Sequence, residues 1–253
     1  MKELMLSIIT VVKNDENNIE NTIKSVLSQK SKLTFEYIVL DGGSTDQTFN
    51  IIKKYKNKID FIQSKTDMGL YHALNRAVRL SKGKYIGILH SGDVYSSNYI
   101  IEKHRIHFNN KKFDLIFSNL KIVKNNKVFR YYDSSSFKKK HLLYGWMPPH
   151  PTCFIKRKKI IEANFYNINY KISSDYDLLL RLFFKYNINY LHIPMTSIYQ
   201  SRGGLSDRGL VSKFLIFKEI ILSLKKNNLY KNFFYIIYRY WFKIKELVKK
   251  NDS

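Results

Sequence analysis

Two hydrophobic patterns alternate along the first half of the chain, continuous apolar runs and apolar residues at helical spacing. Near-continuous apolar runs cover residues 4–12, 35–40 and 84–89, and such runs are typical of buried parallel strands. Between the first two runs, apolar residues recur every three or four positions over 19–27, the spacing of one helix face. The alternation of strands with helices predicts an α/β fold with a doubly wound, mainly parallel sheet.

Turn and capping residues add shorter elements to this half. Ser44 with Gln47 three residues later resembles a capping box, which predicts a helix from Ser44 to about Tyr55. The other elements we expect are a strand over 59–62, helices after Asp67-Met68-Gly69 and over 96–109, and a strand over 113–117.

The second half of the chain changes to antiparallel strands. Residues 121–124 and 127–130 flank Asn125-Asn126, a pair suited to a two-residue hairpin turn. The sheet is therefore expected to be mixed. The proline-rich residues 146–151 predict a stiff loop without helix. The remaining elements expected are a helix entered through 172–175, strands around 189–200 and a helical pattern from about 210.

Charge sets the C-terminal part apart. Residues 211–250 contain ten Lys or Arg and two Glu, interleaved with aromatic residues. This pattern is typical of an amphipathic helix at a membrane interface, and equally of a helix that packs back onto the domain. We therefore expect a domain over 1–209 and a basic aromatic helical segment over 210–253.

The whole chain carries a net charge of +24. Such a charge indicates an anionic partner, which can be a nucleic acid, an acidic membrane surface or a phosphorylated substrate; a compositional bias towards Lys and Asn explains it as well. Cys153 is the single cysteine, which excludes an intrachain disulfide and suits a reducing compartment. No apolar run approaches the ~20 residues of a spanning helix, and no signal peptide is recognised. We expect a cytoplasmic protein, or one peripheral to the inner face of the cell membrane.

Three acidic residues stand at predicted strand ends or helix starts, namely Asp41, Asp93 and Asp175. In open α/β sheets, ligands bind at the carboxyl ends of the strands. At such a strand end, Asp93 could hold a divalent cation that in turn binds phosphate oxygens. Taken singly, each acid also suits an ordinary turn or a helix cap.

Six sequence blocks, in order, resemble those of the family-2 inverting glycosyltransferases with a GT-A fold, in particular the bacterial surface-polysaccharide subgroup. The resemblance runs from about residue 5 to about residue 207. Two departures are Gly42-Gly43 after Asp41, where many relatives have a second acid, and Gly92 before a single Asp93. The blocks are residues 7–14, 38–46, 67–75, 88–93, 149–152 and 174–181.

The resemblance implies a Rossmann-like nucleotide-sugar-binding domain, followed by C-terminal helices. It implies an enzyme that transfers a sugar from a nucleotide-sugar, a UDP-sugar first among the candidates, to a saccharide acceptor that is lipid-linked. Asp93 would bind Mn²⁺ or Mg²⁺, and Asp175 would be the catalytic base of an inverting displacement. His150 and Arg202 would contact the acceptor or the diphosphate, or are plain loop residues. The implied nucleotide-sugar contacts are Thr10, Val12, Asn14, Asp41, Asp67, Asn75, Ser91 and Gly92.

Two other functions compete with this interpretation. A nucleic-acid-binding protein is supported by the net charge alone, without a recognisable binding motif, so no nucleic-acid partner is expected. A catalytically weak glycosyltransferase-like partner subunit is suggested by the thinned acid clusters around Asp41 and Asp93.

Overall fold

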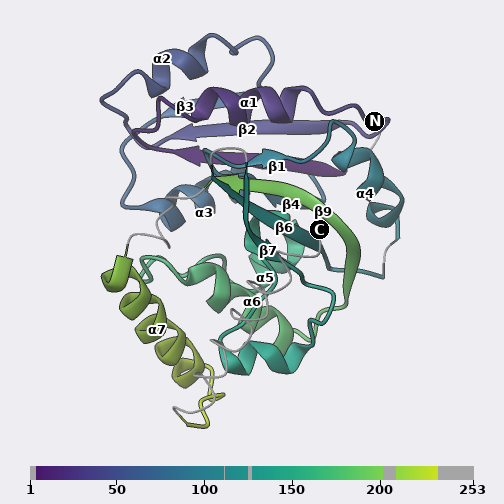
Figure 1. Ribbon diagram of the computed structural model, residues 1–253, viewed down its shortest axis with the longest axis vertical. Helices are drawn as coiled ribbons and strands as arrows, with labels where there is room; N and C mark the ends of the chain where they lie inside the picture. Colours follow the sequence, from purple (N-terminus) through teal and green to yellow (C-terminus); the bar gives the residue numbers. More distant parts are fainter. Residues whose placement is uncertain (1–3, 111, 125–126, 202–208, 233–253) are drawn as a thin grey trace.

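The computed structural model describes residues 4–110, 112–124, 127–201 and 209–232. Within these residues nine strands form one central sheet with helices on both faces (Figure 1). The strands are β1 (Leu6–Val12), β2 (Phe35–Asp41), β3 (Phe61–Ser64), β4 (Tyr85–Ile88), β5 (Val94–Tyr95), β6 (Leu115–Lys124), β7 (Lys127–Tyr132), β8 (Phe154–Lys156) and β9 (Tyr190–Ser201). The helices are α1 (Ile19–Leu27), α2 (Thr48–Lys53), α3 (Leu70–Leu80), α4 (Ile100–Phe108), α5 (Arg157–Glu162), α6 (Ser174–Phe184) and α7 (Gly209–Lys226), with 3₁₀ turns η1 (Lys139–Tyr144) and η2 (His150–Thr152).

The first half of the sheet is parallel. Its strand order is β3-β2-β1-β4, and every neighbouring pair in this half runs in the same direction. All seven residues of β1 are buried, because helices cover both faces of the sheet. This burial explains why the strand reads as a nearly unbroken apolar run.

Strand direction reverses after β4. β8 pairs antiparallel with both β4 and β6, β9 runs parallel to β6, and β5 closes the sheet antiparallel to β9. The predicted mixed, mainly parallel α/β sheet is thereby confirmed. The hairpin is confirmed as well, because Lys124 pairs with Lys127 across β6 and β7; Asn125 and Asn126 lie outside the described residues.

The apolar helix faces pack into two cores, one on each side of the sheet. Ile19, Ile23 and Val26 of α1 are fully buried on one side, with residues of α2 and α4. Leu74 and Val78 of α3 are buried on the other, with residues of α6 and α7. The helix faces read from the sequence are the ones that the sheet buries.

Several expected elements differ in their bounds or their kind, among them the strand expected over 59–62, which is β3 at Phe61–Ser64. The helix expected from Ser44 begins only at Thr48, because the Ser44 hydroxyl donates to the Asp41 carboxylate instead of capping a helix. The helix over 96–109 begins at Ile100, and the two strands expected over 113–124 are one continuous strand, β6. The proline-rich loop contains the short η2 turn, where Pro151 sits at an early position that tolerates its missing N–H.

The C-terminal helix α7 packs beside α6 (Figure 1). Ile220 and Leu224 on its inner face belong to the main core and are nearly fully buried. Residues 233–253 of the predicted basic segment lie outside the described residues. Among the helices that the structure describes, none combines the length and the apolar character needed to cross a membrane.

Candidate functional site

The carboxyl ends of β1, β2 and β4 meet at one edge of the sheet. The parallel register places Val12 opposite Asp41, and β1 and β4 are direct neighbours. The loops that follow these strands therefore lie together, as the sequence predicted for ligand-binding residues. Six of the eight predicted nucleotide-sugar contacts lie in these strands or loops, namely Thr10, Val12, Asn14, Asp41, Ser91 and Gly92.

Asp41 organises the loop after β2. Its carboxylate accepts hydrogen bonds from the N–H groups of Gly43 and Ser44, at 3.2 and 3.0 Å, and from the hydroxyls of Ser44 and Ser64. The side chain is fully buried. Gly43 has a φ of 75°, and a Cβ there would lie 2.8 Å from the hydroxyl of Thr66. The Asp41 carboxylate thus fixes the shape of the loop from inside.

The loops after β1 and β2 are joined to each other. The Asn14 side chain accepts a hydrogen bond from the Thr45 N–H at 2.9 Å, and the Asn14 N–H donates to Ser44 Oγ at 2.8 Å. Thr10 is fully buried, and its hydroxyl donates to the Leu89 carbonyl at 2.8 Å. Thr10 therefore fixes the strand ends from inside the sheet rather than presenting its side chain to a ligand.

Asp67 and Asn75 are engaged in internal contacts near this edge. Asp67 forms an ion pair with Arg76 at 2.7 Å and contacts His72 Nδ1 at 3.0 Å. Asn75 binds both backbone groups of Tyr166, each at 2.8 Å. Asn75 thereby ties α3 to the chain that follows α5.

Asp93 lies in the turn between β4 and β5 and is 3% exposed. Burial raises the pKa of its carboxyl to about 8, although Gln200 Nε2 lies 3.3 Å from Oδ2. Gly92, with a φ of 91°, donates its N–H to Thr22 and accepts from the Ser201 hydroxyl. Hydrogen bonds to α1 and β9 therefore hold the turn. The hydrogen bonds to the Asp93 carboxyl offset only part of the cost of burying its charge.

The donor groups around Asp93 suit a cation that is shared with a substrate. The described residues contain no group of three His, Cys, Asp or Glu side chains that could enclose a metal ion. Mg²⁺ in proteins is usually held by one or two carboxylates together with substrate phosphates. The buried hydroxyl of Ser91 has no hydrogen-bond partner among the described residues. Asp93, with this hydroxyl two residues away, fits such a shared ion rather than a closed metal cage.

Two histidines, the half-buried His90 and the buried His150, continue the site from β4 towards η2. The rings of His90 and His150 lie 6.3 Å apart, and His150 Nε2 lies 2.9 Å from the Tyr166 hydroxyl. Burial lowers the pKa of His90 to about 4 and that of His150, which also faces His90, to about 3. Both rings are therefore neutral at physiological pH, when each can donate or accept a hydrogen bond.

Asp175 lies in the first turn of α6 and is partly exposed. Burial, and to a lesser extent the charge of Asp175, raises the pKa of Tyr71 and of Tyr166. The same two causes raise the pKa of the buried Cys153 thiol, which makes this thiol unreactive. Asp175 thus acts electrostatically on Tyr166, whose hydroxyl contacts His150, and the His150 ring lies near His90 beside the turn that carries Asp93.

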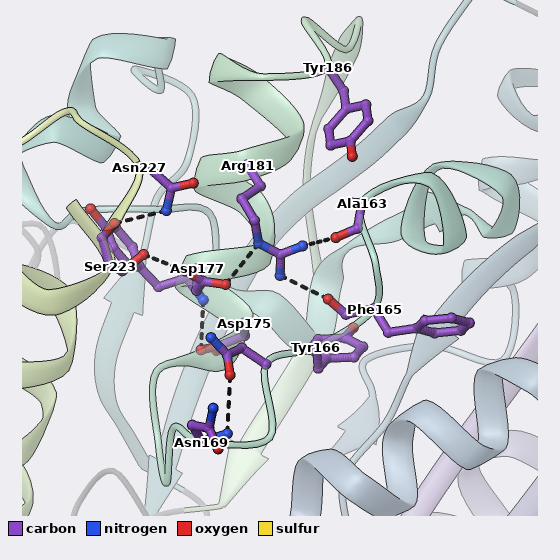
Figure 2. Close-up of polar contacts among 12 residues, drawn as sticks. Ala163, Phe165, Tyr166, Asn169, Asp175, Asp177, Arg181, Tyr186, Ser223 and Asn227 are labelled. Carbon is purple, nitrogen blue, oxygen red and sulfur yellow. Dashed lines mark hydrogen bonds and ion pairs between the residues drawn. The ribbon is translucent and has the colours of Figure 1, made fainter. Parts of the chain in front are cut away.

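The pair Asp177 and Arg181 braces α6 against its neighbours, as shown in Figure 2. Their side chains lie 2.8 Å apart on the helix. Arg181 also donates to the carbonyls of Ala163 and Phe165, and Asp177 accepts from Ser223 of α7 at 2.7 Å. The pair therefore ties α6 both to α7 and to the chain that follows α5.

One predicted residue is not described by the structure, and three residues near the site were not predicted. Arg202 lies outside the described residues. Sequence reasoning missed Tyr166 and Gln200, which contact His150 and Asp93. It also missed Glu219, which accepts hydrogen bonds from the backbone just before α6. The signal available for Glu219 was its position as the one acidic residue of α7.

The family model for glycosyl transferase family 2 matches residues 7–166. An uncharacterized glycosyltransferase of Methanocaldococcus jannaschii is 28% identical over 190 residues, which cover 72% of this chain and 65% of that protein. A PGL/p-HBAD biosynthesis glycosyltransferase of Mycobacterium tuberculosis is 27% identical over 187 residues, which cover 72% of this chain and 71% of that protein. This chain therefore spans about two thirds of these relatives, and slightly less for the archaeal protein.

Solved structures show the same fold at low sequence identity. Staphylococcus aureus TarS 1–349 in complex with UDP-GlcNAc superposes with a TM-score of 0.69 and 17% identity, covering 87% of this chain and 66% of that chain. The mannosyltransferase PcManGT of Pyrobaculum calidifontis, in complex with GDP-Man and Mn²⁺, gives 0.62 and 12%, covering 90% and 65%. The predicted GT-A fold is thus confirmed.

Proposed function

The chain belongs to glycosyl transferase family 2, and from this membership we propose that it transfers a sugar from a nucleotide-sugar donor to a saccharide acceptor with inversion. The observation that carries the proposal is a row of side chains that begins at His90, whose carbonyl accepts from the Asp93 N–H. The rings of His90 and His150 lie 6.3 Å apart, His150 Nε2 lies 2.9 Å from the Tyr166 hydroxyl, and the charge of Asp175 contributes to the raised pKa of Tyr166. The row joins a carboxyl suited to a diphosphate-bound cation with a partly exposed carboxylate suited to proton removal.

The donor side is the edge formed by the loops after β1, β2 and β4. We propose that the linked loops around Asn14 and Asp41 hold the nucleoside, mainly through backbone groups, since both side chains bond within the protein. A UDP-sugar is the first candidate because TarS binds UDP-GlcNAc. Asp93 would hold Mn²⁺ or Mg²⁺, and the bound ion would supply Lewis-acid stabilisation of the leaving diphosphate.

On the acceptor side, Asp175 acts as the general base. It removes the proton from the acceptor hydroxyl, whose oxygen attacks the anomeric carbon while the bond from that carbon to the diphosphate oxygen breaks. Attack from the opposite face inverts the configuration at that carbon. General-base help of this kind contributes about 10²- to 10⁴-fold to the rate. The neutral rings of His150 and Tyr166 line the path between donor and base.

We further propose that the acceptor is lipid-linked and that α7 brings the protein to an anionic membrane surface on its cytoplasmic side. Val211 and Phe214 are 80% and 69% exposed on this helix. The exposed charged side chains of α7 are lysines, because its single acid, Glu219, is buried. Apolar side chains with flanking lysines are the composition that binds anionic headgroups.

A thermal-shift panel of UDP-, GDP- and dTDP-sugars, with and without Mn²⁺, tests the proposed function. We expect one donor to raise Tm in a Mn²⁺-dependent way and to be slowly hydrolysed. Asp175→Asn should keep the Tm shift and lower hydrolysis by about 10²- to 10⁴-fold, because it removes the base alone.

Two outcomes of this panel would favour the competing functions. A donor shift without turnover in the wild-type protein would indicate a catalytically weak partner subunit. The absence of any donor shift, together with salt-dependent binding to duplex DNA, would contradict the proposal and favour a nucleic-acid-binding protein.

A further inference from the structure

A carboxylate on α7 holds the segment that leads into α6. Glu219 is 4% exposed, and its Oε1 accepts a hydrogen bond from the Lys171 N–H at 2.7 Å. Its Oε2 accepts from the N–H groups of Ile172 and Ser173, at 3.1 and 2.8 Å. One buried side chain thus satisfies three consecutive backbone donors.

The same segment is held from α3 on the other side. The Tyr71 hydroxyl donates to the Ile172 carbonyl. Ser173, the residue before α6, forms no side-chain cap, and its buried hydroxyl has no partner among the described residues. The direction in which the chain enters α6 is therefore fixed by side chains of α3 and α7 rather than by a local cap.

This entry direction determines where Asp175 lies. Asp175 follows the last amide bonded by Glu219 by two residues, within the first turn of α6. A second tie acts on the same turn, because Ser223, four residues after Glu219, donates to Asp177 at 2.7 Å. A misplacement of about 1 Å in a reacting group can cost about 10²-fold in rate, so the hold on this turn bears directly on catalysis.

We propose that Glu219 is a positioning residue that orients Asp175 for proton removal. The inference rests on the proposed function, in which Asp175 is the base. It makes α7 a working part of the active site, although this helix lies beyond the residues 7–166 that the family model matches. Electrostatics agree with this proximity, since both Asp175 and Glu219 act on Tyr71 to raise its pKa.

The test compares three variants in the full chain, using hydrolysis of the nucleotide-sugar that gives the largest Tm shift. Glu219→Gln replaces one accepting oxygen by an NH₂ group that faces a backbone N–H. We expect its kcat to fall at least tenfold while the donor KM stays within twofold. Glu219→Asp keeps both acceptor oxygens and should recover part of the lost kcat. Leu224→Ala, a buried change on the same helix, should lower Tm and leave the kcat of the folded enzyme unchanged.

Amide hydrogen exchange provides a readout that is independent of turnover. In Glu219→Gln we expect the amides of residues 171–173 to exchange at least tenfold faster, with the strands of the sheet unaffected. Suppose that Asp175→Asn inactivates the enzyme but Glu219→Gln keeps the kcat and the amide exchange of the wild type. That result would overturn this inference and leave the proposed function standing. A wild-type protein without donor binding or turnover would overturn the proposed function, and this inference with it.

Discussion

A single buried carboxyl, that of Asp93, determines how the proposed cation site depends on pH. In the ligand-free protein the burial that raises its pKa to about 8 keeps most of it protonated at neutral pH. A divalent cation has to displace this proton, because metal ligands bind in their deprotonated form. The affinity of the protein for the cation is therefore linked to pH.

We predict that Mn²⁺ enhances nucleotide-sugar binding more strongly at pH 8 than at pH 6.5. Below a pKa of about 8 the enhancement should weaken by up to about tenfold per pH unit. Isothermal titration calorimetry of a nucleotide-sugar with and without Mn²⁺ measures this effect. Asp93→Asn should abolish the Mn²⁺ enhancement and its pH dependence, whereas Glu162→Gln, a carboxyl change on α5, should retain both. An equal enhancement at the two pH values would contradict the prediction.

For single residues, the sequence predicts which side chains lie near the site better than it predicts what they contact. The sequence predicts that Asp41 and Asn75 lie at the site, but both side chains form hydrogen bonds within the protein. A hydrogen bond from Ser44 to Asp41 competes with a helix cap, and the sequence does not show which of the two forms. Glu219 stands out as the one acidic residue of α7, but it lies 46 residues or more from the backbone groups it binds, so the sequence does not show what it contacts.

At the scale of elements, burial decides what the sequence can predict. The strands of the first half and the inner faces of α1 and α3 are predicted well, because the sheet buries them on a regular period. Irregular pieces are predicted poorly: β6 continues through two register shifts as one strand. Its continuity depends on pairing with β9, about 75 residues later in the chain.

The exposed face of α7 carries the prediction for membrane binding. We expect the full chain to bind vesicles containing phosphatidylglycerol, and to be released by salt. The double change Val211→Ser and Phe214→Ser should weaken binding at least fivefold, because it removes the apolar side chains that enter the headgroup region. Co-sedimentation with vesicles measures this effect.

A matched control for this experiment lies on α4. Ile106 is 63% exposed there, and Ile106→Ser should leave vesicle binding unchanged. Lys218→Glu on α7 should weaken binding further, since each basic residue near an anionic surface contributes about 1 kcal/mol. Equal binding of the Val211→Ser and Phe214→Ser protein and of the wild type would contradict the assignment of α7 as the membrane contact.

For the whole molecule, the shifted pKa values of Asp93, of the site histidines His90 and His150, and of His104 in the core beneath α4 predict a maximum of stability near pH 6.5. The pKa of the Asp93 carboxyl is raised on folding, so its contribution to stability declines as the pH rises towards about 8. The pKa values of His90, His104 and His150 are lowered on folding, so their contribution is lost as the pH falls below about 6.5. Urea unfolding of the ligand-free protein between pH 5 and 8.5 measures both limbs. Asp93→Asn should flatten the alkaline limb, and a stability that rises steadily to pH 8.5 would contradict the assignment.

The reversal of strand direction between β4 and β8 also bears on how such a protein can diverge. The strands before the reversal carry the loops proposed to hold the donor, and the elements after it carry His150 and Asp175. Changes in the second half can therefore alter which acceptor is used while the donor cradle keeps its register. Protein engineers who recombine the two halves at this border should keep β9 with the donor half, because Gln200 and Ser201 hold the turn that carries Asp93.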